Sequence, residues 1–98
     1  MKIESGETVI VVLQTPREKL VGVVNEINAA GIHIRAIDLG YFDDWSRAIA
    51  SGEPHLSMTD YFFPMWRVER VTRDEAGGDI PSMTEQFNQR TGRELGEF

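Results

Sequence analysis

The sequence predicts a single domain built mainly from β-strands. Its 98 residues suffice for one hydrophobic core but not for two. Several short runs are rich in β-branched and aromatic residues, and Gly, Pro, Asn or Asp residues separate them. The composition, 41% hydrophobic and 27% charged, is that of an ordinary globular chain. Residues 1–98 are therefore treated as one domain, with residues 80–98 as a C-terminal helix and tail.

The first strand is predicted over residues 7–13. This run, ETVIVVL, is apolar and β-branched, Gly6 precedes it, and Gln14-Thr15-Pro16 closes it.

The next stretch, TPREKLVGVVNEINAAG over residues 15–31, is compatible with two structures. As a helix it has a capping box formed by Thr15 and Glu18, Pro16 at the first helical position, and an apolar stripe. The fold would then be α+β with a β-α-β start. As a strand it has several valines, and Gly22, which is unfavourable inside a helix, marks a place where a strand can bend.

Two further elements follow. Residues 31–39, GIHIRAIDL, predict a strand in which the apolar positions change register after Ile34, as a β-bulge would cause. Residues 43–51 predict a short inserted helix, because Asp43 and Asp44 lie at its start and Gly52 follows its end.

The last third of the chain predicts two strands and a helix. Strands over residues 57–63 and 68–73 are separated by Pro64 and a tight turn at residues 65–67. Residues 82–91 predict a C-terminal helix, because Ser82 and Glu85 form a capping-box pattern and Gly92 ends it.

The segment FFPMWRVERV, residues 62–71, together with the upstream order of elements, resembles the Sm-like (LSm) family of SH3-type small barrels. The resemblance covers residues 7–39 and 57–73, and it rests on the strand, one-turn break and closing strand around Pro64, and on the mid-strand Gly22. It implies a five-stranded SH3-like barrel in which TPREK is a hairpin turn and LVGVVNEI is a bent second strand. Sm-like proteins typically form rings by pairing edge strands, and many bind single-stranded RNA.

Five residues are candidates for contact with RNA or another partner: Trp66, Arg67, Met65, Asn28 and Arg35. Trp66 beside Arg67 could stack a base and hold a phosphate, although an aromatic residue at this place could equally pack the barrel mouth or a subunit interface. The chain departs from the family pattern in two places. The loop that begins at Asn28 has Ile32 where the family has an asparagine, and the turn at residues 65–67, where related proteins place basic or glycine residues for RNA, has Arg67 as its only cation. The interleaving of arginines with acidic residues over residues 67–75 favours a salt-bridged surface over an anion site.

No catalytic, cofactor or metal pattern is recognised. The chain has no cysteine, and His33 and His55 lack a second ligand at metal-binding spacing. GxSxG, GxGxxG and GxxxxGK[ST] do not occur. We therefore expect no enzyme activity, no cofactor and no metal. No signal peptide and no apolar run of about 20 residues is recognised, so the expectation is a cytoplasmic protein without a membrane segment.

The leading expectation is a non-enzymatic Sm-like module that forms homo-oligomers, including rings, and binds a partner. The first alternative is a single-stranded RNA-binding ring protein, which the formal net charge of −6 disfavours. The second is a small regulatory ligand-binding α+β domain, which follows from the helical interpretation of residues 15–31.

Overall fold

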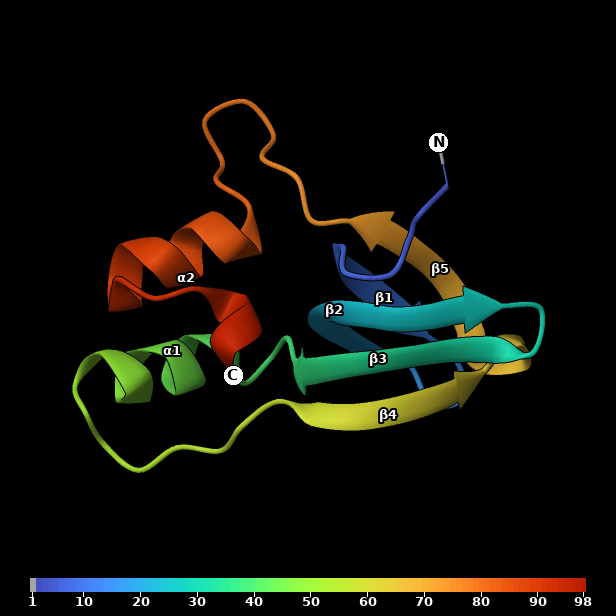
Figure 1. The fold of residues 1–98 in the computed structure, drawn as a ribbon, viewed down its shortest axis with the longest axis horizontal. Helices are drawn as coiled ribbons and strands as arrows, with labels where there is room; N and C mark the ends of the chain where they lie inside the picture. The colour runs from blue at the N-terminus through green and yellow to red at the C-terminus, as the bar shows by residue number, and fades with distance from the viewer. Residues whose placement is uncertain (1) are drawn as a thin grey trace.

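The computed structural model describes residues 2–98 and contains a curved five-stranded antiparallel sheet with two short helices at one end (Figure 1). The sheet order is β4-β3-β2-β1-β5. Its strands are β1 (Thr8–Leu13), β2 (Glu18–Asn28), β3 (Gly31–Asp38), β4 (Thr59–Pro64) and β5 (Val68–Arg73). The helices are α1 (Phe42–Ala50) and α2 (Met83–Thr91), and 3₁₀ turns form η1 (Met65–Arg67) and η2 (Leu95–Glu97). The five predicted strands and both predicted short helices are confirmed, with ends that differ by at most two residues.

Residues 18–28 form a strand, so the helical interpretation of this stretch is wrong. β2 pairs with β1 on one side and with β3 on the other. The apolar spacing looked helical because adjacent residues Leu20 and Val21 are both buried, one on each face of the sheet. A strand covered on both faces shows no clean alternation of apolar and polar residues. The tertiary environment therefore overrides the local helix signals.

Gly22 and Gly31 lie where strands approach too closely for a side chain. A Cβ atom at Gly22 would lie 2.6 Å from the Cα of Ala36 and would also collide with the carbonyl oxygen of Arg35. At Gly31 it would collide with the carbonyl oxygen of Phe63 and the ring of Phe62. The mid-strand glycine predicted in the second strand thus permits the tight packing of β2 on β3.

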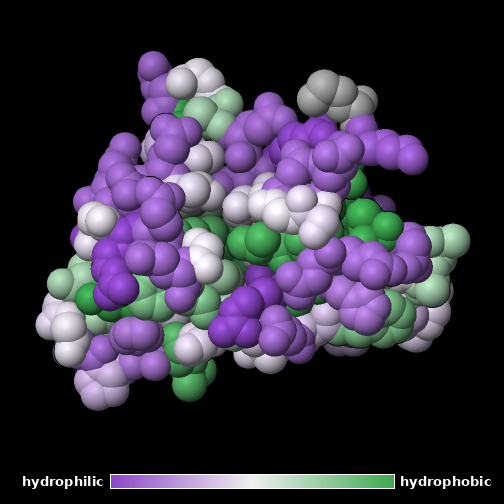
Figure 2. Space-filling view, in the orientation of Figure 1, coloured by the Kyte–Doolittle hydropathy of each residue, from purple (hydrophilic) through white to green (hydrophobic). Residues whose placement is uncertain are grey.

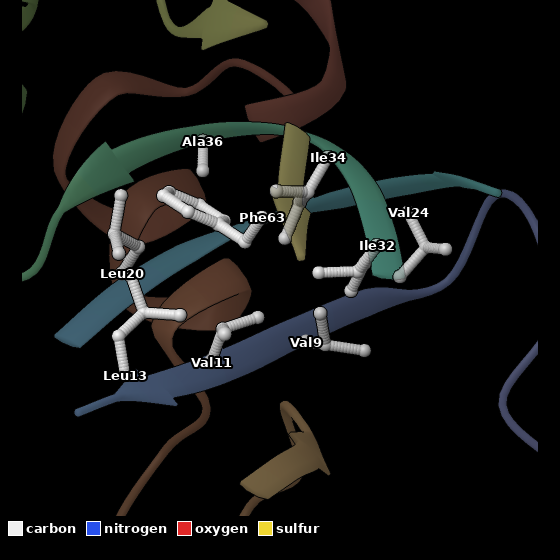
Figure 3. Packing of buried hydrophobic residues seen from close by; sticks show 9 residues of the cluster. All are labelled: Val9, Val11, Leu13, Leu20, Val24, Ile32, Ile34, Ala36 and Phe63. Atoms are coloured by element: carbon white, nitrogen blue, oxygen red, sulfur yellow. The ribbon is translucent and has the colours of Figure 1, made fainter. Parts of the chain in front are cut away.

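The concave face of the sheet encloses the first hydrophobic core (Figure 3). Its buried side chains point inward from four strands, so the curvature of the sheet surrounds them. They are Val9, Val11, Leu13, Leu20, Val24, Ile32, Ile34, Ala36 and Phe63.

The opposite face packs against the helices and forms a second core. Trp45 and Phe42 of α1 contact Phe87 of α2, with ring centroids 5.2 Å (Trp45–Phe87) and 6.3 Å (Phe42–Phe87) apart. Ile37 of β3 belongs to this second core. The predicted bulge in residues 31–39 is therefore wrong. Ile32 and Ile34 belong to the first core and Ile37 to the second, so the buried positions move to the other face of β3 where the helices begin to cover it. The irregularity lies in the partner strand, between Val24 and Glu26 of β2.

The sheet is not closed into a barrel, which corrects the predicted five-stranded SH3-like barrel. Within residues 2–98 no pairing joins β4 to β5, and these two strands form the edges of the sheet. η1 instead spans the gap between them. The Met65 N–H donates to the Ala30 carbonyl at 2.9 Å, and the Gln14 N–H donates to the Arg67 carbonyl at 2.8 Å. Backbone hydrogen bonds therefore anchor η1 at both of its ends.

Candidate functional site

The candidate site consists of η1 and the two turns that it touches, and we call it the η1 end of the molecule. One neighbour is the β2–β3 turn, whose Ala30 carbonyl accepts the Met65 N–H. The other is the β1–β2 turn, where the Gln14 side-chain amide donates to the Trp66 carbonyl at 2.7 Å. Residues from three separate parts of the sequence therefore meet at one end of the sheet.

Trp66 is the main exposed group of this end, with 65% of its surface accessible. Its backbone is held by Gln14, so the indole projects from an ordered turn. Asn28 lies across the β2–β3 turn, where its side-chain oxygen accepts the Ala30 N–H at 2.8 Å and its amide donates to Glu26. The structure thus places Met65, Trp66 and Asn28 at the same end, while the hydrogen bonds of Asn28 stabilise its own turn.

The Arg67 side chain stabilises the β1–β2 turn. Its guanidinium donates to the Pro16 carbonyl at 2.8 Å, to Glu18 at 2.9 Å and to the Gln14 carbonyl at 3.2 Å. Only 17% of its side chain is accessible. These hydrogen bonds occupy the guanidinium that the sequence analysis proposed as a phosphate contact.

Arg35 lies apart from the other four candidates. It is in the middle of β3, forms an ion pair with Asp60 at 3.2 Å and donates to the Phe98 carbonyl at 2.9 Å. These contacts are with β4 and the C-terminal segment, not with η1. The structure therefore does not bring Arg35 into the η1 end.

Carboxylates neutralise most of the arginines near the sheet edges, as predicted for a salt-bridged surface. Arg73 donates to Glu7 at 2.6 Å, and this hydrogen bond holds the pKa of the Glu7 carboxyl below its ordinary value of 4.5. On the helices, the hydrogen bond from Arg90 lowers the pKa of Asp43 in the same way. Arg70 has no ion-pair partner within residues 2–98.

The aromatic edge strand β4 is the feature that the sequence analysis missed. Tyr61 is 37% and Phe62 is 47% accessible, and the Phe62 ring lies 4.7 Å from the ring of His33. Antiparallel pairing directs the backbone groups of alternate residues to opposite sides of a strand. The Met65 N–H bonds to the Ala30 carbonyl, so the backbone groups of residue 65 face β3, and so do those of residues 63, 61 and 59 in alternation. The backbone N–H groups of Asp60 and Phe62 therefore point away from β3. The run of three aromatic residues at 61–63 was the available signal.

Within residues 2–98, the structure contains no pocket, no group of three potential metal ligands, and no helix long and apolar enough to cross a membrane. Comparison with protein-family models, curated proteins and solved structures finds no significant match to this chain.

Proposed function

We propose that this chain is a non-enzymatic module of Sm-like type that self-associates through an open strand edge and presents the η1 end to a partner. The observation that carries the proposal is the pair of unpaired edge strands, β4 and β5, on either side of the sheet. An exposed edge offers free backbone donors and acceptors, which favours pairing with another chain. The sheet order and the short η1 between the edge strands support the Sm-like assignment.

Asp60→Pro tests this proposal at the edge of β4. The Asp60 N–H has no acceptor within residues 2–98, so proline removes an outward donor without removing a bond to β3. Thr59 before it is already extended, as a residue preceding proline prefers. Asp60→Ala is the matched control, because it also removes the ion pair with Arg35 and keeps the N–H.

Native mass spectrometry of the three proteins at equal concentration measures the result. We expect an oligomer for the parent chain and for Asp60→Ala, and at least a tenfold weaker association for Asp60→Pro. A parent chain that is monomeric at high micromolar concentration would exclude self-association. Equal association of all three proteins would exclude the β4 edge.

Binding of single-stranded RNA is a second candidate function. The exposed indole of Trp66 favours it, because a base can stack on such a ring for about 1–3 kcal/mol. The test is RNA affinity measured at two salt concentrations for the parent chain, Trp66→Ala and Trp66→Phe. Loss of affinity in the alanine variant with retention in the phenylalanine variant supports stacking. Absence of binding at low salt removes this candidate.

A further inference from the structure

The two edges of the sheet differ in their chemistry. β5, with the sequence VERVTR, carries Glu69, Arg70 and Arg73, and its register against β1 is interrupted at Val12/Leu13. Charged residues and bulges on an edge strand hinder pairing with another chain. β4, with the sequence TDYFFP, has one charged residue, and Arg35 neutralises it. β4 is therefore the less protected edge.

No other element covers the outer side of β4. Figure 1 shows it as the outermost strand at the bottom of the sheet, with nothing beside its outer edge. In the same orientation, the lower right margin in Figure 2 is mainly pale green and white, whereas much of the remaining face is purple. Of the six large hydrophobic residues that are exposed within residues 2–98, three lie on β4 and η1: Tyr61, Phe62 and Trp66.

We propose that β4 pairs antiparallel with β4 of a second copy, about a two-fold axis at Phe62, and so joins two sheets into one. This inference rests on the self-association proposed above and specifies which edge is used. The outward backbone groups of the two Phe62 residues then exchange two hydrogen bonds. Each Asp60 N–H faces the Pro64 carbonyl of the other copy, and Pro64, which has no N–H, lies near the end of the shared ladder.

The electrostatics of β4 favour this register. With Phe62 on the axis, each Asp60 lies opposite Pro64 of the other copy, so no two like charges are paired. A register centred on Asp60 would instead place two carboxylates opposite each other. Because Arg35 lies 3.2 Å from Asp60 in each copy, the seam carries little net charge despite the overall charge of −6.

The side chains of β4 are self-complementary in the same register. On one face the two Phe62 rings become neighbours, and each already contacts His33. On the other face Tyr61 lies opposite Phe63 of the second copy. Aromatic pairs directly across antiparallel strands stabilise a sheet. A head-to-tail contact between β4 and β5 would instead place this aromatic edge against charged Glu69 and Arg70.

Cysteine cross-linking distinguishes the two arrangements, because the parent chain contains no cysteine. Phe62→Cys places two thiols across a pair whose Cα atoms are about 5.5 Å apart, within disulfide range. Asp60→Cys is the control on the same strand, since its two copies would lie about 14 Å apart along the strands. Thr72→Cys is the control on β5, where the side chain is also exposed.

We expect mild oxidation to convert Phe62→Cys to a covalent dimer and to leave both control variants at least tenfold less cross-linked. A disulfide between Phe62→Cys and Thr72→Cys in a mixture, with a parent assembly larger than a dimer, would overturn β4–β4 pairing and leave self-association intact. A parent chain that stays monomeric at high micromolar concentration, together with a Phe62→Cys variant that does not cross-link, would overturn both.

Hydrogen exchange of the parent chain provides a measurement that does not depend on any substitution. The amides of Asp60 and Phe62 have no acceptor in a single copy, so they should exchange at least tenfold more slowly when the concentration favours the dimer. The outward-facing amide of Val71 on β5 should not change. Slowing at Val71 without slowing at Phe62 would exclude the proposed seam.

Discussion

Gly22→Ala should destabilise the protein strongly, because β2 and β3 touch at this position. The new methyl group would lie 2.6 Å from both the Cα and the Cβ of Ala36 and would also collide with the Arg35 carbonyl. Ordinary carbon–carbon contacts are about 3.5–4.0 Å, so the two strands must separate by about 1 Å. The atoms in the way belong to the backbone of β3 or to a methyl group that cannot rotate aside.

The expected cost is about 3 kcal/mol, the upper part of the usual range for an overpacked interior. That is a large fraction of the roughly 5–15 kcal/mol that stabilises a typical domain. The melting temperature of a domain of this size should fall by about 15 °C. Urea unfolding monitored by far-ultraviolet circular dichroism gives the free energy of unfolding, and thermal unfolding gives the melting temperature.

Gly77→Ala is the matched control, because a Cβ at Gly77 meets no atom within 4 Å and its backbone is not in the left-handed region. Its free energy of unfolding should change by less than about 0.5 kcal/mol. If Gly22→Ala lost less than about 1 kcal/mol relative to this control, the close approach of β2 and β3 would be refuted as the reason for glycine at this position.

Three further changes test other contacts. Arg67→Ala should lower the free energy of unfolding, measured in urea, by about 2–3 kcal/mol, because it removes charged hydrogen bonds to Glu18 and the Pro16 carbonyl. A decrease below about 0.5 kcal/mol would show that the stability of the η1 end does not depend on Arg67. The hydrogen bond from Arg73 lowers the pKa of Glu7 in the folded state. The stabilisation from this pair is therefore fully present above the pKa of Glu7 in the unfolded chain, near 4.5, and is lost as the pH falls through the lower pKa of Glu7 in the folded state. The melting temperature of the parent chain should therefore fall more between pH 6 and pH 3 than that of Glu7→Gln, and parallel curves would contradict the ion pair. Ser82→Ala removes the side-chain oxygen that accepts the Glu85 N–H at 3.0 Å and should cost about 1 kcal/mol, whereas Ser82→Asp should retain most of the stability.

Local sequence signals located most of the elements because their causes are local. β-branched runs and turn residues predicted the strands, and the Ser82 capping box with Gly92 predicted α2. Gly92 adopts the left-handed conformation that ends a helix, with φ of 71°. Such features depend on residues a few positions apart, so a single sequence contains the information needed to find them.

The candidate site was only partly predictable. Trp66 and Asn28 lie at the same end of the sheet, because η1 is hydrogen-bonded to the β2–β3 turn. Arg67 was chosen for its charge, but its guanidinium is occupied by the β1–β2 turn, about 50 residues away in sequence. Arg35 was also a candidate contact residue, but it lies away from η1 and pairs with Asp60 of β4. Which carboxylate or carbonyl meets a long cationic side chain depends on the relative placement of distant strands, which no local pattern specifies.

Composition and short-range pattern alone predicted a mainly β chain with two short helices, and they placed the ends of most elements to within two residues. The strand at residues 18–28, which the resemblance implied but local signals left open, is confirmed by the tertiary structure. Only the tertiary structure decided that the sheet stays open between β4 and β5 and that an aromatic edge is exposed. The physical reason is that burial on both faces of a sheet, and the pairing of its edges, depend on contacts between residues far apart in the chain. Those contacts outweigh local preferences of about 1 kcal/mol per residue.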